Sequence, residues 1–316
     1  MSKGNFQAVL DIGSNSLHLI IGEVFEDGTF RIVDREKSRL RLATLDKNGM
    51  PTIDKQEADL AVILIQKAMH LASFYDAPIK VVATSAVREA QQNMDFIERV
   101  QRDTGLQLTV ITGEQEAAYI YSGVCSFLPE FKKSKILCFD IGGGSTELII
   151  GENGESKYLN SLKMGSVRLA KKFFPNFEVR DYGINACREH VAHLLSEVTK
   201  PIQTIGFENC VGSAGTVKSV ATIMEQYRII TPTETEPKVI TKEKYKEVFD
   251  LVMSKPTFKE RCAAFTIEEK RIDVLPAGMI IMEGIFEHLG VEKVTYSDYA
   301  LREGVLFSTI DQTEAV

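Results

Sequence analysis

The sequence predicts an α/β protein built from two similar units, and two observations lead to this prediction. Residues 11–22 read DIGSNSLHLIIG and residues 140–151 read DIGGGSTELIIG, so eight of twelve positions are identical at a spacing of 129 residues (140 minus 11). In both places the repeat opens the same order of elements, strands first and then strands alternating with helices. We therefore expect a duplicated arrangement with a ligand bound in the crevice between the two units.

The composition is that of a globular protein large enough for about two domains. The chain has 316 residues, 44% of them hydrophobic, a formal net charge of −7 and five scattered cysteines without a C-x-x-C pair. The acidic balance argues against a nucleic-acid binder, and we expect reduced cysteines without catalytic or metal-binding roles. The sequence shows neither a signal-peptide pattern nor an apolar run of about 18 residues, so we expect a cytoplasmic protein without membrane contact.

The first unit is expected to begin with a meander of strands. Its predicted elements are strands at 6–12, 16–25 and 30–34, a strand or loop at 37–43, a helix at 54–74, a strand running into a helix at 79–90, a helix at 93–104, a strand at 108–112 and a helix at 113–124. In the first helix, Asp54 is the expected N-cap and Glu57 completes a capping box. Arg39 and Arg41 alternate with apolar residues, which suits a half-exposed strand or loop whose basic side chains all point one way, and the alternative is an ordinary solvated face.

Two further features of the first unit are candidates for chemistry. Arg88 falls in the first turn of a helix that follows a buried strand, where free N–H groups favour an anion, although a surface arginine is an equal alternative. Glu114 and Glu116 fall in the first turn of the next helix. They either stabilise that helix start or supply a carboxylate that activates water.

The second unit repeats this plan after a basic linker at 127–135. Its predicted elements are strands at 135–140, 146–151 and 156–162, a helix from about Gly165, a helix at 184–200, a strand at 208–215, a helix from Thr216, a helix at 274–290, and a strand, turn and helix within 292–307. Residues 228–273 carry no motif that indicates a function.

The repeated turns predict phosphate binding. Small residues let backbone N–H groups approach a phosphate closely, and the Asp of each turn can hold Mg²⁺. A third turn of small residues, GSAGT at 212–216, lies between a strand and a helix in the arrangement that binds anions. The alternative is a tight hairpin in which Asp accepts from backbone amides and Gly supplies the turn conformation.

Several motifs together resemble the exopolyphosphatase/guanosine pentaphosphate phosphatase (Ppx/GppA) family. In chain order they are DIGSNSLHL, ATSAVREA, TGEQEA, DIGGGSTEL, MGSVRL, GSAGTVK, VLPAG and YALREGVL, between residues 11 and 307. The resemblance implies two actin-like domains (ribonuclease H-like, the superfamily of actin, heat-shock chaperone ATPases and sugar kinases) with a central cleft. The implied domains are 1–124 with 299–316, and 125–298. We expect the short form, without the C-terminal HD-type region of larger relatives.

The resemblance also implies roles for individual residues. Glu116 takes the position of the catalytic base, beside Gln115 where the family pattern has a second Glu. Asp140 and Glu147 are implied to serve catalysis by holding the cofactor Mg²⁺, and Asp11 is a further metal-binding candidate. The implied phosphate-binding residues are Ser14, Asn15, Arg88, Gly143, Gly144 and Ser145, and the third turn adds Ser213 and Gly215.

The expected function is hydrolysis of terminal orthophosphate from inorganic polyphosphate, or conversion of guanosine pentaphosphate to tetraphosphate, with water activated by Glu116. A non-catalytic sensor that binds polyphosphate or guanosine tetraphosphate is one alternative, and an actin-like ATPase or kinase is another. The expected partner is the phosphate substrate, without nucleic acid or membrane, and a homodimer is left open.

Overall fold

The structure is a computed structural model that describes most of the chain. The described residues are 5–27, 29–45, 51–90, 93–231 and 237–313. The chain divides into two compact units, each with its own sheet and hydrophobic core. Unit 1 is Met1–Gly123 together with Leu301–Val316, and unit 2 is Val124–Ala300. The bounds predicted from sequence, after residue 124 and before residue 299, differ from these by one and two residues.

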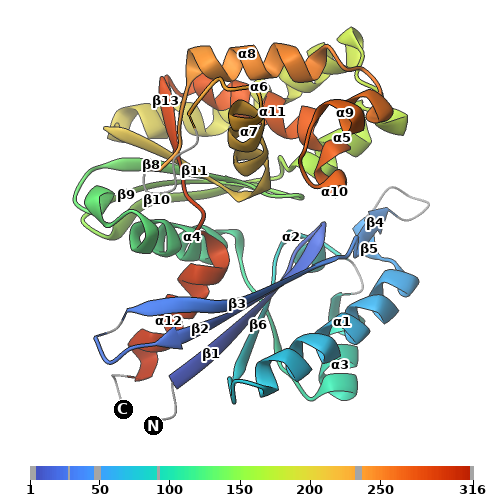
Figure 1. The fold of residues 1–316 in the computed structure, drawn as a ribbon, viewed down its shortest axis with the longest axis vertical. Helices are drawn as coiled ribbons and strands as arrows, with labels where there is room; N and C mark the ends of the chain where they lie inside the picture. The colour runs from blue at the N-terminus through green and yellow to red at the C-terminus, as the bar shows by residue number, and fades with distance from the viewer. Residues whose placement is uncertain (1–4, 28, 46–50, 91–92, 232–236, 314–316) are drawn as a thin grey trace. The chain divides into compact units, whose positions relative to one another are not determined.

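Unit 1 contains a five-stranded sheet in the order β3-β2-β1-β6-β7 (Figure 1). Its strands are β1 (Asn5–Ile12), β2 (Ser16–Val24), β3 (Phe30–Arg39), β6 (Ile79–Ala83) and β7 (Leu108–Val110). Neighbours among β1, β2 and β3 are antiparallel, whereas β6 and β7 continue the sheet in parallel. A separate small hairpin pairs β4 (Ala43–Leu45) with β5 (Pro51–Ile53).

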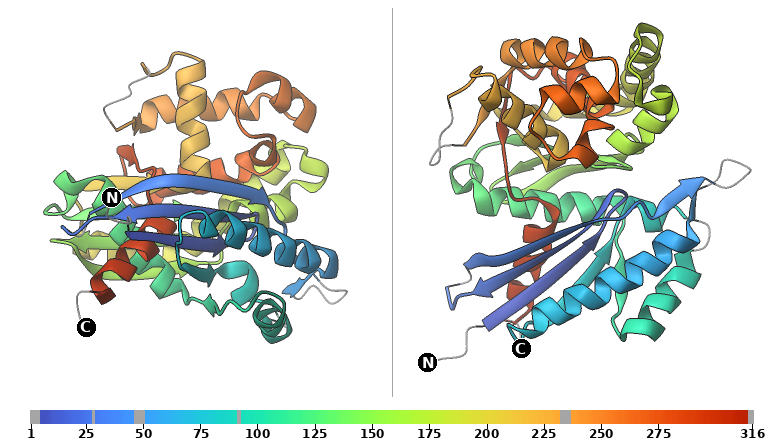
Figure 2. Two further views of the ribbon diagram at one scale, coloured as in Figure 1. Left: turned by 60° about the horizontal axis from the view of Figure 1, so that its bottom comes forward. Right: turned by 45° about the vertical axis from the view of Figure 1, so that its right-hand side comes forward.

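Helices pack on both faces of this sheet (Figure 2). They are α1 (Lys55–Ser73), α2 (Ser85–Arg88), α3 (Asn93–Thr104), the part of α4 (Gly113–Phe127) up to Gly123, and α12 (Leu301–Thr313). Apolar residues of α1 and α3 form one core with alternate residues of β1 and β2. On the other face Gly22 lies against α12, where an added Cβ would stand 2.5 Å from a methyl group of Leu306.

The predicted N-cap of α1 is confirmed, but the predicted capping box is wrong. The Asp54 carboxylate accepts from the N–H groups of Gln56 and Glu57 at 2.9 and 3.0 Å. The Glu57 carboxylate accepts from the N–H of Arg41 at 2.9 Å, while the N–H of Asp54 donates to the carbonyl of Leu42. The segment after β3 thus binds the Glu57 carboxylate and the Asp54 N–H, the two groups that would have bonded to each other in a capping box, because it runs beside the start of the helix.

Unit 2 contains a six-stranded sheet in the order β10-β9-β8-β11-β13-β12. Its strands are β8 (Ile136–Ile141), β9 (Thr146–Glu152), β10 (Glu155–Leu162), β11 (Asn209–Ser213), β12 (Val239–Thr241) and β13 (Lys293–Tyr296). Its α-helices after α4 are α5 (Ser166–Phe173), α6 (Asp181–Ile205), α7 (Ala214–Gln226), α8 (Lys242–Met253), α9 (Phe258–Ala264), α10 (Glu269–Ile272) and α11 (Leu275–His288). One continuous core joins the sheet to α5, α6, α7, α8 and α11.

The two sheets repeat one arrangement, as the sequence predicted. Strands β3, β2, β1 and β6 of unit 1 follow the same order and relative directions as β10, β9, β8 and β11 of unit 2. Because antiparallel hairpins need only short turns, each unit presents a tight turn between its first two strands. Within the described residues, no helix is both long and apolar enough to cross a membrane.

The segment without a recognisable motif, 228–273, contributes a buried arginine to unit 2. Arg261 is 0% exposed. Its guanidinium donates to four carbonyl oxygens, those of Phe177, Lys255, Pro256 and Ile272, at 2.6 to 3.3 Å. Burial lowers its pKa from the ordinary value. The side chain therefore connects three chain segments of unit 2, around Phe177, around Lys255 and Pro256, and around Ile272.

Candidate active site

The two repeated turns have the same closing hydrogen bond. The N–H of Gly13 donates to the carbonyl of Ser16, and the N–H of Gly142 donates to the carbonyl of Ser145, both at 3.0 Å. These bonds are related by the same 129-residue spacing as the sequence repeat (142 minus 13). Duplication is therefore preserved down to the main chain of the turns.

Helix α5 holds the carbonyl groups of the second turn. The N–H of Ser166 donates to the carbonyl of Gly142 at 2.9 Å. The N–H groups of Val167 and Arg168 both donate to the carbonyl of Gly143, at 3.0 and 3.1 Å. The first N–H groups of a helix have no partner inside it, so the turn supplies the acceptors that α5 needs.

These bonds decide which way the N–H groups of the turn point. The Arg168 side chain adds a bond from Nε to the carbonyl of Gly144 at 2.8 Å, so three successive carbonyl groups point toward α5. In a planar trans peptide the N–H points opposite to the C=O. The N–H groups of Gly143, Gly144 and Ser145 are therefore directed away from α5.

The contact between this turn and α5 depends on Gly165. An added Cβ there would stand 2.3 Å from the carbonyl carbon and oxygen of Gly143. We expect Gly165→Ala to shift the turn and to lower kcat/KM for a phosphate substrate by about tenfold, because misplacement of binding groups by a fraction of an ångström is costly. The measurement is orthophosphate release, with Lys172→Ala, an exposed change on α5, as the control. Unchanged kinetics in Gly165→Ala would show that the turn does not bind the substrate.

Two buried carboxylates lie beside the second turn. Asp140 on β8 and Glu147 on β9 are direct partners in the strand register and are 8% and 1% exposed. The Ser213 hydroxyl donates to Asp140 Oδ2 at 2.6 Å, and the Ser161 hydroxyl donates to Glu147 Oε1 at 2.7 Å. The sequence did not identify Ser161. Only the pairing of β9 with β10, which places it opposite Glu147, brings it to the site.

These carboxylates fit a magnesium ion. Carboxylates directly opposite one another across two strands repel, and a bound cation removes that repulsion. Among the residues that the structure describes, no group of three or more His, Cys, Asp or Glu side chains is placed to hold a metal. Mg²⁺ does not need one, because it is usually held by one or two carboxylates together with substrate phosphates and water.

The first turn is held mainly by the segment after β3. Asn15 is 6% exposed, and its side-chain oxygen accepts from Arg41 Nε at 3.3 Å. Its carbonyl accepts from the N–H of Leu40. Ser14 is half-buried. The predicted phosphate residue Asn15 is thus anchored by an arginine whose partner the sequence did not identify.

A histidine takes the place of the second carboxylate in unit 1. His18 lies opposite Asp11, as Glu147 lies opposite Asp140 in the repeat. The guanidinium of Arg302 is bonded to Nδ1 of His18. The other ring nitrogen of His18, Nε2, lies 2.7 Å from Ser16 Oγ, within hydrogen-bonding distance.

Glu116 and Arg88, predicted separately, form one pair. Glu116 is 8% exposed and lies in the first turn of α4. Its Oε2 accepts from Arg88 Nη1 at 2.9 Å, and the same nitrogen donates to the carbonyl of Ile111 at 2.9 Å. Arg88 thus fixes the carboxylate within unit 1.

Gln115, where the family pattern has Glu, has a structural role. Its side-chain oxygen accepts from the N–H of Thr112 at 2.9 Å, and its own N–H donates to the Thr112 hydroxyl at 3.1 Å. This reciprocal pair is a capping box at the start of α4, which Gln forms as well as Glu. The departure therefore leaves the helix start intact.

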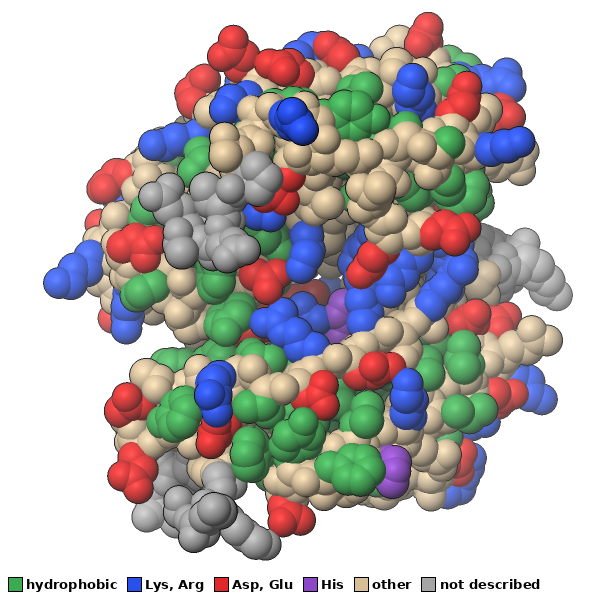
Figure 3. All heavy atoms as spheres, viewed as in Figure 1, with side chains coloured by type: hydrophobic (Ala, Val, Ile, Leu, Met, Phe, Trp, Pro, Cys, Tyr) green, Lys and Arg blue, Asp and Glu red, His purple; other side chains and the backbone are tan. Residues whose placement is uncertain are grey.

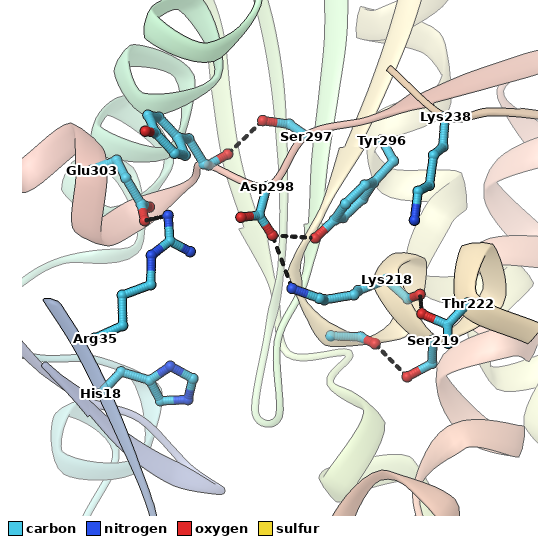
Figure 4. Close-up of polar contacts among 12 residues, drawn as sticks. His18, Arg35, Lys218, Ser219, Thr222, Lys238, Tyr296, Ser297, Asp298 and Glu303 are labelled. Carbon is cyan, nitrogen blue, oxygen red and sulfur yellow. Dashed lines mark hydrogen bonds and ion pairs between the residues drawn. The ribbon is translucent and has the colours of Figure 1, made fainter. Parts of the chain in front are cut away.

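Basic side chains gather in unit 1 along β3. Figure 3 shows Lys and Arg side chains clustered beside a histidine on the face drawn. In the register of β2 and β3, Lys37 lies opposite His18 and Arg39 lies opposite Ser16. Arg35, two residues further along, is 3.8 Å from the buried Glu303 carboxylate (Figure 4). Such a row of cations in an acidic chain suits an anionic ligand.

The third turn is packed within unit 2. Gly215 lies under the guanidinium of Arg271, whose Cζ would stand 2.2 Å from an added Cβ. Ser213 is 1% exposed, and its hydroxyl donates to Asp140. In the same unit Asp298 accepts from Lys218 and from the Tyr296 hydroxyl (Figure 4).

Each of the two α/β units has a turn of small residues between its first two strands, with a carboxylate beside the turn. This arrangement defines a phosphate-handling protein of the actin-like fold. The chain belongs to the Ppx/GppA phosphatase family, whose model matches residues 20–313. It is a phosphohydrolase, and the predicted family and fold are confirmed.

Three similar proteins illustrate the match. A Haemophilus influenzae protein, provisionally named an exopolyphosphatase, is 30% identical over 97% of this chain and 92% of its own length. A guanosine-5'-triphosphate,3'-diphosphate pyrophosphatase of Vibrio campbellii is 32% identical over 96% of this chain, which spans 59% of that relative. The crystal structure of the Aquifex aeolicus family member has a TM-score of 0.82 and 29% identity over 98% of both chains.

Proposed function

We propose that the protein is a Mg²⁺-dependent enzyme that releases terminal orthophosphate from inorganic polyphosphate or converts guanosine pentaphosphate to the tetraphosphate. The name of the Haemophilus relative supports the first reaction and that of the Vibrio relative supports the second. The observation that carries the proposal is the second turn, whose three carbonyl groups are bonded to α5. The N–H groups that point the other way are suited to phosphate oxygens.

The turns bind and orient the phosphate that is to be transferred. The transition state of phosphoryl transfer spreads its charge over three equatorial oxygens. The N–H groups of Gly143, Gly144 and Ser145 offer several donors to one such group. These donors are fixed before substrate arrives, so they need little reorganisation during the reaction.

Asp140 and Glu147 would hold the Mg²⁺ ion, which when bound offsets the negative charge of the phosphate oxygens. Both are buried and supported by serine hydroxyls. Asp11, opposite His18, stays a predicted further ligand.

Glu116 is the proposed general base. Its carboxylate is held at one oxygen by Arg88, which limits its motion and places a positive charge beside it. A carboxylate fixed in this way is suited to orienting a water molecule and accepting its proton as the water attacks phosphorus. Arg88 is also proposed to contact a phosphate oxygen. As the new bond from water to phosphorus forms, the bridging P–O bond breaks, and the shortened polyphosphate or guanosine tetraphosphate leaves with the bond electrons.

The proposal is tested by orthophosphate release with Mg²⁺ and with EDTA. Tripolyphosphate, long-chain polyphosphate and guanosine pentaphosphate are assayed in parallel, with ATP as a fourth substrate. We expect release from at least one of the first three, lost in EDTA and restored by Mg²⁺. Binding without release would favour the sensor alternative, and turnover of ATP alone would favour the ATPase alternative. A cytoplasmic location and a homodimer stay predictions.

A further inference from the structure

Four polar residues form one cross-strand row in the sheet of unit 2. The register pairs Ser161 on β10 with Glu147 on β9, Glu147 with Asp140 on β8, and Asp140 with Ser213 on β11. Residues paired across neighbouring strands lie on the same face of a sheet. The row therefore has two carboxylates in the middle and one hydroxyl at each end.

Each hydroxyl donates to the carboxylate next to it. The oxygen–oxygen distances are 2.7 Å from Ser161 to Glu147 and 2.6 Å from Ser213 to Asp140. These distances are typical of short bonds from a hydroxyl to an ionised carboxylate. Three of the four residues are at most 8% exposed, and Ser161 is half-buried. One oxygen of each carboxylate is thus oriented by a neighbour in the row.

The corresponding row in unit 1 differs from the row in unit 2 both in its carboxylates and in its end residues. There the register pairs Lys37 on β3 with His18 on β2, His18 with Asp11 on β1, and Asp11 with Val82 on β6. This copy keeps the Asp but has no second carboxylate. Neither end position carries a hydroxyl. Of the two duplicated rows, only the one in unit 2 has two carboxylates, and only that row has a serine hydroxyl at each end.

The chain also carries backbone strain next to Ser213. Ala214 has a φ of 66°, a conformation that costs a residue with a Cβ of the order of 1 kcal/mol or more. Such strain persists only where the surrounding structure demands it. Here it lets the chain leave β11 and enter α7 directly after Ser213, whose hydroxyl stays on Asp140.

We propose that Ser161 and Ser213 are positioning residues that orient Glu147 and Asp140 toward one Mg²⁺ ion. Ser213 then acts through Asp140, in place of the phosphate contact predicted from its turn. The inference rests on the proposed function only in taking Mg²⁺ as the ion.

The first test is direct metal binding to the whole protein. Mn²⁺ alone is titrated and followed by electron paramagnetic resonance in the unaltered protein, Ser161→Ala and Ser213→Ala. We expect each substitution to weaken Mn²⁺ binding by about 10-fold or more, the usual loss when a hydrogen-bond partner of a metal ligand is removed. Ser156→Ala, an exposed change on β10, is the matched control and should bind Mn²⁺ normally.

The second test separates positioning from a structural role. In steady-state phosphate release, the Mg²⁺ concentration for half-activation should rise by about tenfold in the alanine variants. KM for tripolyphosphate at saturating Mg²⁺ should stay within about twofold, because the phosphate-binding turn is untouched. Ser161→Thr keeps the hydroxyl and should restore metal binding.

Two different outcomes would contradict the inference, and they separate the positioning role from the metal assignment. Equal Mn²⁺ affinity in the unaltered protein and both alanine variants would overturn the positioning role alone. An unaltered protein that binds no Mn²⁺ and releases phosphate in EDTA would overturn both the positioning role and the metal assignment of the proposed function.

Discussion

Glu116→Gln is expected to lower kcat for phosphate release by about 100-fold or more while KM changes little. Glutamine has the same shape and can still accept from Arg88, whose Nη1 now lies 2.9 Å from Glu116 Oε2. The substitution therefore removes the basic group without removing its anchor. Initial rates over a range of substrate concentrations at saturating Mg²⁺ give the two constants separately.

Glu114→Gln is the matched control for this experiment. Glu114 lies in the same first turn of α4, but it is exposed. Removal of its charge should leave kcat within about twofold, since an acidic residue at a helix start adds only a few tenths of a kcal/mol to stability. Near-normal turnover in Glu116→Gln would exclude Glu116 as the base and leave its pair with Arg88 a structural one.

Arg261→Met is expected to lower the free energy of unfolding of unit 2 by about 3–5 kcal/mol. The guanidinium is fully buried and donates to four carbonyl oxygens. Methionine fills part of the space but leaves these acceptors without a donor, at about 1 kcal/mol or more each. For a unit of this size, Val124–Ala300, the melting temperature should fall by about 6–20 °C.

The control for Arg261 is Arg180→Met. The Arg180 side chain is 64% exposed and pairs with Glu178, also at the surface. Such pairs contribute little, so the melting temperature should change by about 2 °C at most. If the melting temperature of Arg261→Met equalled that of the control, the four carbonyl contacts of Arg261 would not contribute to the stability of unit 2.

The order of elements could be predicted because the signals are local and repeated. The pattern of apolar runs and small-residue turns occurs twice at one spacing, and both copies form the hairpin β1–β2 or β8–β9 with the same closing bond. The N-cap at Asp54 and the start of α4 at Gly113 could likewise be predicted from the sequence, since capping depends on residues within one turn.

The partners of the site residues could not be predicted, because they depend on strand register and on distant chain segments. Ser161 is 14 positions from Glu147, and Arg302 is 284 positions from His18. The sequence suggests an anion contact for Arg88 because it follows a buried strand. In the structure Arg88 Nη1 donates to the Glu116 carboxylate and to the carbonyl of Ile111. Glu57 was wrongly assigned to a capping box because the sequence does not show that Arg41 passes beside it.

The two repeated turns are held in place by different kinds of group, and this affects how each can change during evolution. The second turn is fixed largely by main-chain N–H groups of α5, which most side chains at those positions would supply equally well. The first turn relies on the Asn15 side chain meeting the Arg41 side chain. Sequence drift should therefore be tolerated around the second turn except at Gly165 and at Arg168, whose side chain bonds the Gly144 carbonyl, whereas Asn15 and Arg41 should change only together.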